Sequence, residues 1–78
     1  MSKVHTLNVR VRDVKEAQAL CHIVSQFNYD IDLRQARYVV DAKSILGILS
    51  LDLSQPLLLD AYTGDVSELL AALSHFLI

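Results

Sequence analysis

The stretch Lys43-Ser44-Ile45-Leu46-Gly47-Ile48-Leu49-Ser50-Leu51 decides how the rest of this sequence is interpreted. Its first serine precedes a short apolar run with a helical period. A serine oxygen in that place can cap a helix by accepting a backbone N–H of the first turn. We therefore predict a short helix from Ser44 to about Leu51. Its apolar residues fall on two stripes, and Ile48 and Leu51 are predicted to face the core.

The second stripe of this helix consists of Ile45, Leu46 and Leu49. The chain has 78 residues, which is one small domain with room for a single modest core. In such a domain a short helix can bury only one of its stripes. The second stripe is therefore predicted to be exposed beside Ser44, where an apolar patch is typical of a docking surface.

Alternation of apolar with polar residues predicts four strands around this helix. They cover residues 4–11, 29–34, 38–42 and 57–62. The last of these is apolar on both faces, which is typical of a central strand. The turn at 35–37 joins two strands without the glycine or asparagine that tight hairpins prefer.

Two further helices have start signals and a single apolar face. Asp13 is predicted to cap the first, with Glu16 three residues later as in a capping box, and Asn28 is predicted to end it. Asp65 is predicted to cap the last helix. The core stripe of the first helix comprises Val14, Ala17, Leu20, Cys21, Val24 and Phe27, and that of the last comprises Val66, Leu69, Leu70, Leu73, Phe76 and Leu77.

The predicted order of elements is β-α-β-β-α-β-α. Helices in this number on a four-stranded antiparallel sheet make a two-layer α+β domain. The sequence contains no internal repeat, linker or low-complexity stretch, so residues 1–78 are expected to form a single domain.

Composition excludes several classes of protein. Hydrophobic residues make up 53% of the chain, with only two glycines and one proline, which is typical of a globular domain. A net charge of −2 and a pI near 5.8 give no reason to expect nucleic acid or an anionic membrane as partner. The single cysteine allows no internal disulfide. No apolar stretch has the roughly twenty residues of a membrane span, and the polar first residues are unlike a signal peptide. We therefore expect a cytoplasmic protein.

The motif Lys43-Ser44-Ile45-Leu46-Gly47, in its place within this order of elements, resembles the second helix of HPr, the phosphocarrier of the bacterial sugar phosphotransferase system. The resemblance covers most of the chain. It implies an open-faced β-sandwich, a four-stranded antiparallel sheet with three helices on one face. It also implies that Ser44 is the target of a regulatory kinase and that Lys43, Ile45, Leu46 and Leu49 dock on partner proteins. A ferredoxin-like β-α-β-β-α-β domain with a tail helix is the competing fold.

The resemblance breaks down at the family's phosphorylation site. HPr proteins carry a nucleophilic histidine just before the first helix, within a Gly-(Leu/Ile)-His-Ala-Arg-Pro stretch. Counting back from Ser44 through the first helix puts that histidine on Asp13, the arginine on Lys15 and the proline on Glu16. The preceding loop is then about three residues shorter than in the family. A carboxylate is a good helix cap and repels phosphate, so the phosphohistidine chemistry is predicted to be lost.

No other constellation restores that chemistry. Cys21 lies on a core stripe, where a buried inert thiol is expected, and Asp30 and Asp32 belong to the solvated face of a strand. The three histidines are His5 on the first strand, His22 on the solvent-facing side of the first helix and His75 in the last helical turn. They are far apart in the sequence and lack the spacing of metal ligands, so no metal site is predicted. We expect no enzymatic activity and no cofactor.

The sequence thus favours an HPr-like regulatory or adaptor domain without phosphohistidine carrier activity. It would bind a protein partner, or a second copy of itself, through the Ser44 helix. A paralogue within the family, used in catabolite repression, likewise lacks the histidine and keeps the serine. The alternative is a ferredoxin-like effector-binding or self-assembling domain, which the order of strands in the sheet would distinguish.

Overall fold

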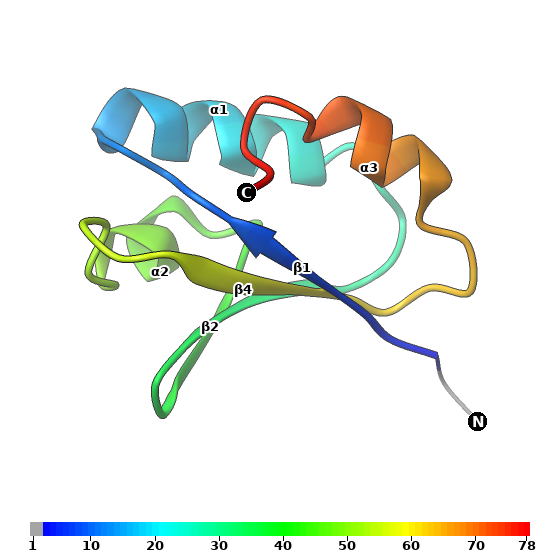
Figure 1. Ribbon diagram of the computed structural model, residues 1–78, viewed down its shortest axis with the longest axis horizontal. Helices are drawn as coiled ribbons and strands as arrows, with labels where there is room; N and C mark the ends of the chain where they lie inside the picture. Colours follow the sequence, from blue (N-terminus) through cyan, green and yellow to red (C-terminus); the bar gives the residue numbers. More distant parts are fainter. Residues whose placement is uncertain (1–2) are drawn as a thin grey trace.

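A computed structural model describes residues 3–78 of the chain, so Met1 and Ser2 of the expected domain lie outside the described residues. The elements appear in the predicted order (Figure 1). They are β1 (His5–Val9), α1 (Val14–Val24), β2 (Ile31–Gln35), β3 (Tyr38–Asp41), α2 (Ile45–Leu49), β4 (Leu57–Ala61) and α3 (Ser67–Ala72).

The four strands form one antiparallel sheet in the order β1-β4-β2-β3. The last strand therefore lies between the first and the second, as its apolar character on both faces predicted. A ferredoxin-like domain would place its first and third strands in the centre of the sheet. Here both of these strands lie at the edges, so the competing fold is wrong and the expected α+β open-faced sandwich is confirmed.

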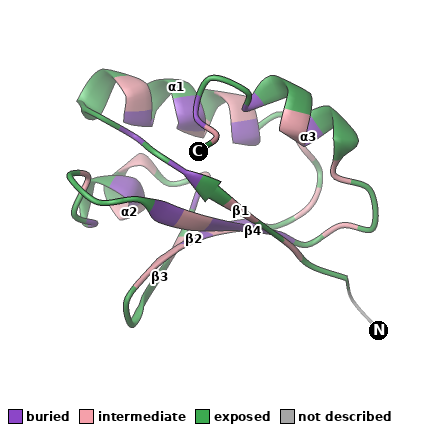
Figure 2. Cartoon of the chain, viewed as in Figure 1, coloured by how far each residue is buried: buried purple, intermediate pink, exposed green. Residues whose placement is uncertain are grey.

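The core lies between the helices and one face of the sheet. Its centre is a row in which Leu7, Leu59, Leu33 and Val40 stand side by side across all four strands. The helices bury their own apolar residues against this face, and Figure 2 shows α1 buried along the side that faces the sheet. The fully buried helical residues are Ala17, Leu20, Val24, Ile48 and Leu69. Among residues 3–78, no helix is long and apolar enough to cross a bilayer.

The opposite face of the sheet holds a buried carboxylate. Asp60 on β4 is only 5% exposed and accepts hydrogen bonds from the Nε and Nη2 atoms of Arg34 on β2. Thr6 on β1 donates a third bond, 2.7 Å from its Oγ1 to the Asp60 Oδ1. The Arg34 hydrogen bonds are the main reason that the pKa of Asp60 lies below its usual value, against the opposing effect of burial. This network joins three strands.

Helix α1 is shorter than predicted. It ends at Val24 instead of Asn28: the N–H of Ser25 makes the last i→i−4 bond, to Cys21, and the N–H groups of Gln26 and Phe27 then bond to carbonyls only three residues back. Its buried stripe also begins one turn later than predicted, at Ala17, since Val14 is 53% exposed.

The last helix also begins later than its sequence signal suggested. Asp65 does not cap α3 directly; its Oδ1 atom accepts the N–H and the hydroxyl of Ser67 and so fixes the turn ahead of the helix. These bonds lower the pKa of Asp65.

The hairpin between β2 and β3 has a two-residue turn, with Gln35 opposite Tyr38. Tight hairpins need a positive φ in the turn, and Ala36 supplies it with a φ of 53°. An alanine in this region costs about 1–2 kcal/mol, and the turn lacks the glycine or asparagine that normally marks such a hairpin in a sequence.

The Asp60 network predicts a specific loss of stability in acid. Because the folded state lowers the pKa of Asp60, its contribution is present above the unfolded pKa of about 3.9 and is lost as the pH falls below it. Thermal unfolding from pH 7 to pH 2 should therefore show native protein and the Asp60→Asn variant differing most at neutral pH and converging in acid. The other carboxylates are shared by both proteins and cancel in the comparison. A difference that stays constant across this range would contradict the assignment.

Candidate functional site

The start of α1 is built around Asp13. Its backbone is extended, and its Oδ1 atom accepts the N–H of Glu16 at 2.8 Å. The side chain is exposed. Asp13 is thus the helix cap that the sequence predicted, and its carboxylate already holds one of the N–H groups that an anion bound at this helix start would use.

Glu16 places a second carboxylate at the same point. Its Oε1 atom accepts the backbone N–H of Arg12 at 2.9 Å, so it reaches one residue further back than in a standard capping box. Its Oε2 atom lies 3.0 Å from the Nε2 atom of His75. The hydrogen bond to His75 is the largest cause, followed by that to Arg12, of a pKa for Glu16 below its usual value.

The contact with His75 corrects the sequence-based interpretation of that residue. His75 was expected in the last helical turn, where it would only complement the helix dipole. Instead α3 ends at Ala72, and the chain then returns to β1, where Leu77 pairs with Val9. His75 is thereby carried to the start of α1, with its side chain 69% exposed. No local sequence signal could have found this contact, because it depends on the pairing of the chain's two ends.

The electrostatics at this helix start disfavour an anion. Two carboxylates stand at the positive end of the α1 dipole, where they stabilise the helix. The same charges oppose a phosphoryl group. Arg12 is paired with Glu16, at 3.7 Å between its Nη1 atom and the Glu16 Oε1 atom, and both Arg12 and Lys15 are exposed, so they attract an anion only weakly. The local arrangement therefore serves as a helix cap.

The second candidate region is α2. Ser44 caps it, with 3.3 Å between its Oγ atom and the N–H nitrogen of Gly47. Ile48 is fully buried, as predicted. Leu46 is 78% exposed and Leu49 37%. Ile45 differs from the prediction, because it is half-buried and packs against the core.

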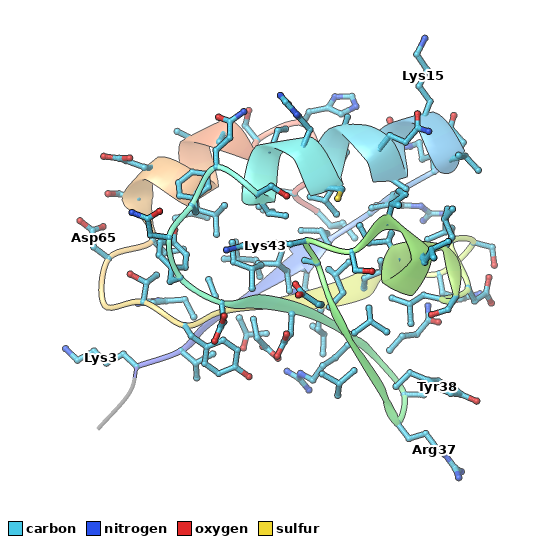
Figure 3. The ribbon with its side chains drawn as sticks, turned by 180° about the vertical axis from the view of Figure 1, so that it is seen from behind. Lys3, Lys15, Arg37, Tyr38, Lys43 and Asp65 are labelled. Carbon is cyan, nitrogen blue, oxygen red and sulfur yellow. The ribbon has the colours of Figure 1, made fainter. Side chains whose placement is uncertain are left out.

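Two residues fix the position of α2: Lys43, which was predicted only to dock on a partner, and Gly47, for which no role was predicted. The Nζ atom of Lys43 donates to the carbonyl of Phe27 at 2.7 Å, so the half-buried ammonium ties the start of α2 to the segment that follows α1. A Cβ at Gly47 would lie 3.2 Å from the Cβ of Val40, so the absence of a side chain there lets α2 lie close against β3. Both views of the chain draw α2 beneath the N-terminal half of α1, and these two helices are in contact (Figures 1 and 3).

The remaining candidates do not assemble into a site. His5 is half-buried on β1, and the Nε2 atom of exposed His22 lies 3.2 Å from that of Gln26, just beyond the end of α1. Cys21, expected in the core, is half-buried and a free thiol. Within residues 3–78 there is neither a cluster of metal-ligating side chains nor a detectable cavity.

The fold is thus a small open-faced β-sandwich, and its two candidate sites are the capped starts of α1 and α2. The family model described as "PTS HPr component phosphorylation site" matches residues 4–77. The chain therefore belongs to the HPr family of the phosphotransferase system.

Solved HPr structures agree with this assignment. The crystal structure of HPr-C-His from Thermoanaerobacter tengcongensis matches with a TM-score of 0.72 and 30% identity, covering 94% of this chain and 88% of that chain. HPr from Bacillus anthracis has the same fold, with a TM-score of 0.71 and 22% identity over 96% of both chains. No curated protein sequence gives a significant match.

The hydrogen bond between Asp13 and Glu16 predicts how substitutions at Asp13 affect stability. Asp13→Ala should lower the free energy of unfolding by about 0.5–2 kcal/mol, because it leaves the N–H of Glu16 without its acceptor. Asp13→Asn should cost much less, since the amide oxygen can accept the same bond. Denaturant unfolding of the two variants distinguishes them. If asparagine proves as harmful as alanine, the charge of Asp13 matters more than its cap, and a functional carboxylate would have to be sought.

Proposed function

We propose that this HPr-family domain is a regulatory or adaptor module that no longer carries a phosphoryl group on histidine. The proposal rests first on Asp13, which takes the histidine's place in the register counted back from Ser44. Its carboxylate is engaged with the N–H of Glu16, and Glu16 adds a second negative charge beside it. A phosphoryl group entering here would meet repulsion where a carrier needs attraction.

The observation that supports a docking role is the exposure of Leu46, which is 78% exposed in the first turn of α2, two residues after its cap Ser44. We call Ser44, Ile45, Leu46 and Leu49 the α2 patch. Ile48 anchors the helix from below and Ile45 packs partly against the core, so α2 is held in place while Leu46 stays exposed. A fixed apolar patch beside polar residues suits docking on a protein surface. Lys43 contributes to docking indirectly, because its hydrogen bond to the carbonyl of Phe27 holds α2 in position.

Ser44 provides the means of regulation. Its side chain is exposed, and its hydroxyl makes only a long cap bond. Phosphorylation would add about −1.5 to −2 charges beside Leu46 and Leu49 and would change which partners the α2 patch accepts. The helix start tolerates that charge, because the phosphate oxygens can accept the same N–H. The module would work in the bacterial cytoplasm, without a cofactor and without enzymatic activity of its own.

The regulatory kinase of the HPr family tests this proposal. With ATP it should add one phosphoryl group to the native protein and none to Ser44→Ala, as intact mass shows. The double variant Leu46→Ser/Leu49→Ser should be modified at least about tenfold more slowly, because exposed apolar side chains near the centre of an interface carry much of the binding energy. Thermal unfolding should show that the double variant still folds, with a modest loss of stability that comes mainly from Leu49, because Leu49 is 37% exposed and Leu46 78%. Val14→Ser, which removes an exposed apolar residue from α1, serves as the matched control and should be modified at the native rate.

Two outcomes would contradict the proposal. A native protein that the kinase leaves unmodified would remove the regulatory role of Ser44. A double variant modified as fast as the native protein would show that the kinase does not use Leu46 and Leu49, and the α2 patch would lose its assigned function.

A further inference from the structure

The two edges of the sheet are treated differently. At the β1 edge the end of the chain returns to the sheet: Leu77 pairs with Val9, and the N–H of Ile78 donates to the carbonyl of Asn8 at 3.1 Å. The β3 edge has no strand or bridge beside it in residues 3–78. The β2–β3 hairpin projects from the body, with Arg37 and Tyr38 pointing outward at its tip (Figure 3).

The backbone of β3 shows which groups are free on that edge. The N–H of Ala42 donates to the carbonyl of Ile31 in β2. Backbone groups alternate in direction along an antiparallel strand, so Tyr38 and Val40 also face β2, while Val39 and Asp41 face outward. The carbonyl of Asp41 accepts the N–H of Ser44 at 3.0 Å. The N–H and carbonyl of Val39 and the N–H of Asp41 remain available for another strand.

The side chains of this edge are apolar in the middle and charged at the ends. Tyr38 is 64% exposed and Val39 59%. At the end of β3, Asp41 stands directly opposite Asp32 of β2, an unfavourable pairing of like charges. Neither aspartate has an ion-pair partner in residues 3–78, and at the other end of β3 neither does Arg37.

We propose that two copies of the chain pair through β3, antiparallel and about a two-fold axis at Val39, into one continuous eight-stranded sheet. In this register Val39 lies opposite Val39 of the second copy, and their outward N–H and carbonyl groups bond to each other. Arg37 and Asp41 are each two residues from Val39, so each Arg37 lies opposite Asp41 of the other copy. Each guanidinium thereby meets the Asp32–Asp41 pair, which has no ion-pair partner among the described residues of its own chain.

The pattern of charges favours a second copy over an unrelated peptide. One cation and one anion at equal distances from the central residue make the edge complementary to itself, as a two-fold interface requires. The paired segment is only five residues long, which makes a small interface and a weak, concentration-dependent dimer. This inference concerns β3 and is independent of the function proposed for the α2 patch.

Sedimentation between about 20 μM and about 1 mM tests the pairing, a range chosen because interfaces of this size bind weakly. The average mass of the native protein should rise from the 8.7 kDa of one chain towards twice that value. Arg37→Asp and Asp41→Lys should each weaken association at least about tenfold, because each places like charges opposite one another in both symmetry-related pairs. An equimolar mixture of these two variants should associate again, since the two carboxylates of one then face the two cations of the other. Lys15→Asp makes the same charge change as Arg37→Asp on α1 and should associate like the native protein.

A third variant tests the backbone pairing. Val39→Pro removes the outward N–H, which β2 does not use, so the monomer should fold while association is lost. Thermal unfolding checks the fold of every variant, and Arg37→Asp lies in an exposed turn where a charge change is tolerated. The proposal is overturned if the native protein stays monomeric at about 1 mM, or if the mixture of the two charge variants does not associate. It is also overturned if Leu46→Ser abolishes association while Arg37→Asp leaves it intact, because that result would place the dimer interface on α2.

Discussion

The structure depends on the position of β4 between β1 and β2. This strand is made last, and every residue from Leu57 to Ala61 is at least half-buried, with Leu59 in the middle of the row that crosses the sheet. By pairing with both β1 and β2 it joins the two halves of the sheet. After β4 the chain forms α3, and its end then lies beside β1. The same strand supplies Asp60, which the hydrogen bonds of Arg34 and Thr6 make compatible with burial. The apolar face fixes how the layers stack, and the Asp60 network fixes the register on the other face.

This topology also determines what the start of α1 can do. Because the chain's end lies against β1, His75 meets Glu16, which the local cap already places beside Asp13. An HPr family member with these residues has kept the sheet, the helices and the serine-capped α2, and it has a carboxylate cap in the register of the histidine. Under the proposed function, this change would remove phosphoryl carriage and leave the α2 patch free to dock on a partner. The start of α1 can change without disturbing α2, because α2 is held by Lys43 and Gly47, and neither residue belongs to the start of α1.

The features that could be predicted from the sequence are those fixed by neighbours along the chain. Asp13 and Ser44 each cap the helix that follows within three residues, and the apolar character of 57–62 marked a central strand. The features that escaped prediction join distant segments. Asp60 and Arg34 meet only once the register of two strands is set, and Lys43 reaches Phe27 only after α2 has docked. Periodicity also could not reveal where a helix extends past the core, so Val14 was assigned to the interior although it is exposed.

The central claim, that the histidine chemistry is lost, is tested most directly by the first enzyme of the phosphotransferase system. The protein is incubated with that enzyme and phosphoenolpyruvate, beside an HPr that carries the family's histidine, and both are measured by intact mass under conditions that preserve phosphohistidine. The account predicts that the mass of this protein stays unchanged while the control gains one phosphoryl group. An acid-labile gain mapped to any histidine of this chain would contradict it, and His75, 3.0 Å from Glu16 at the start of α1, is the position to examine first.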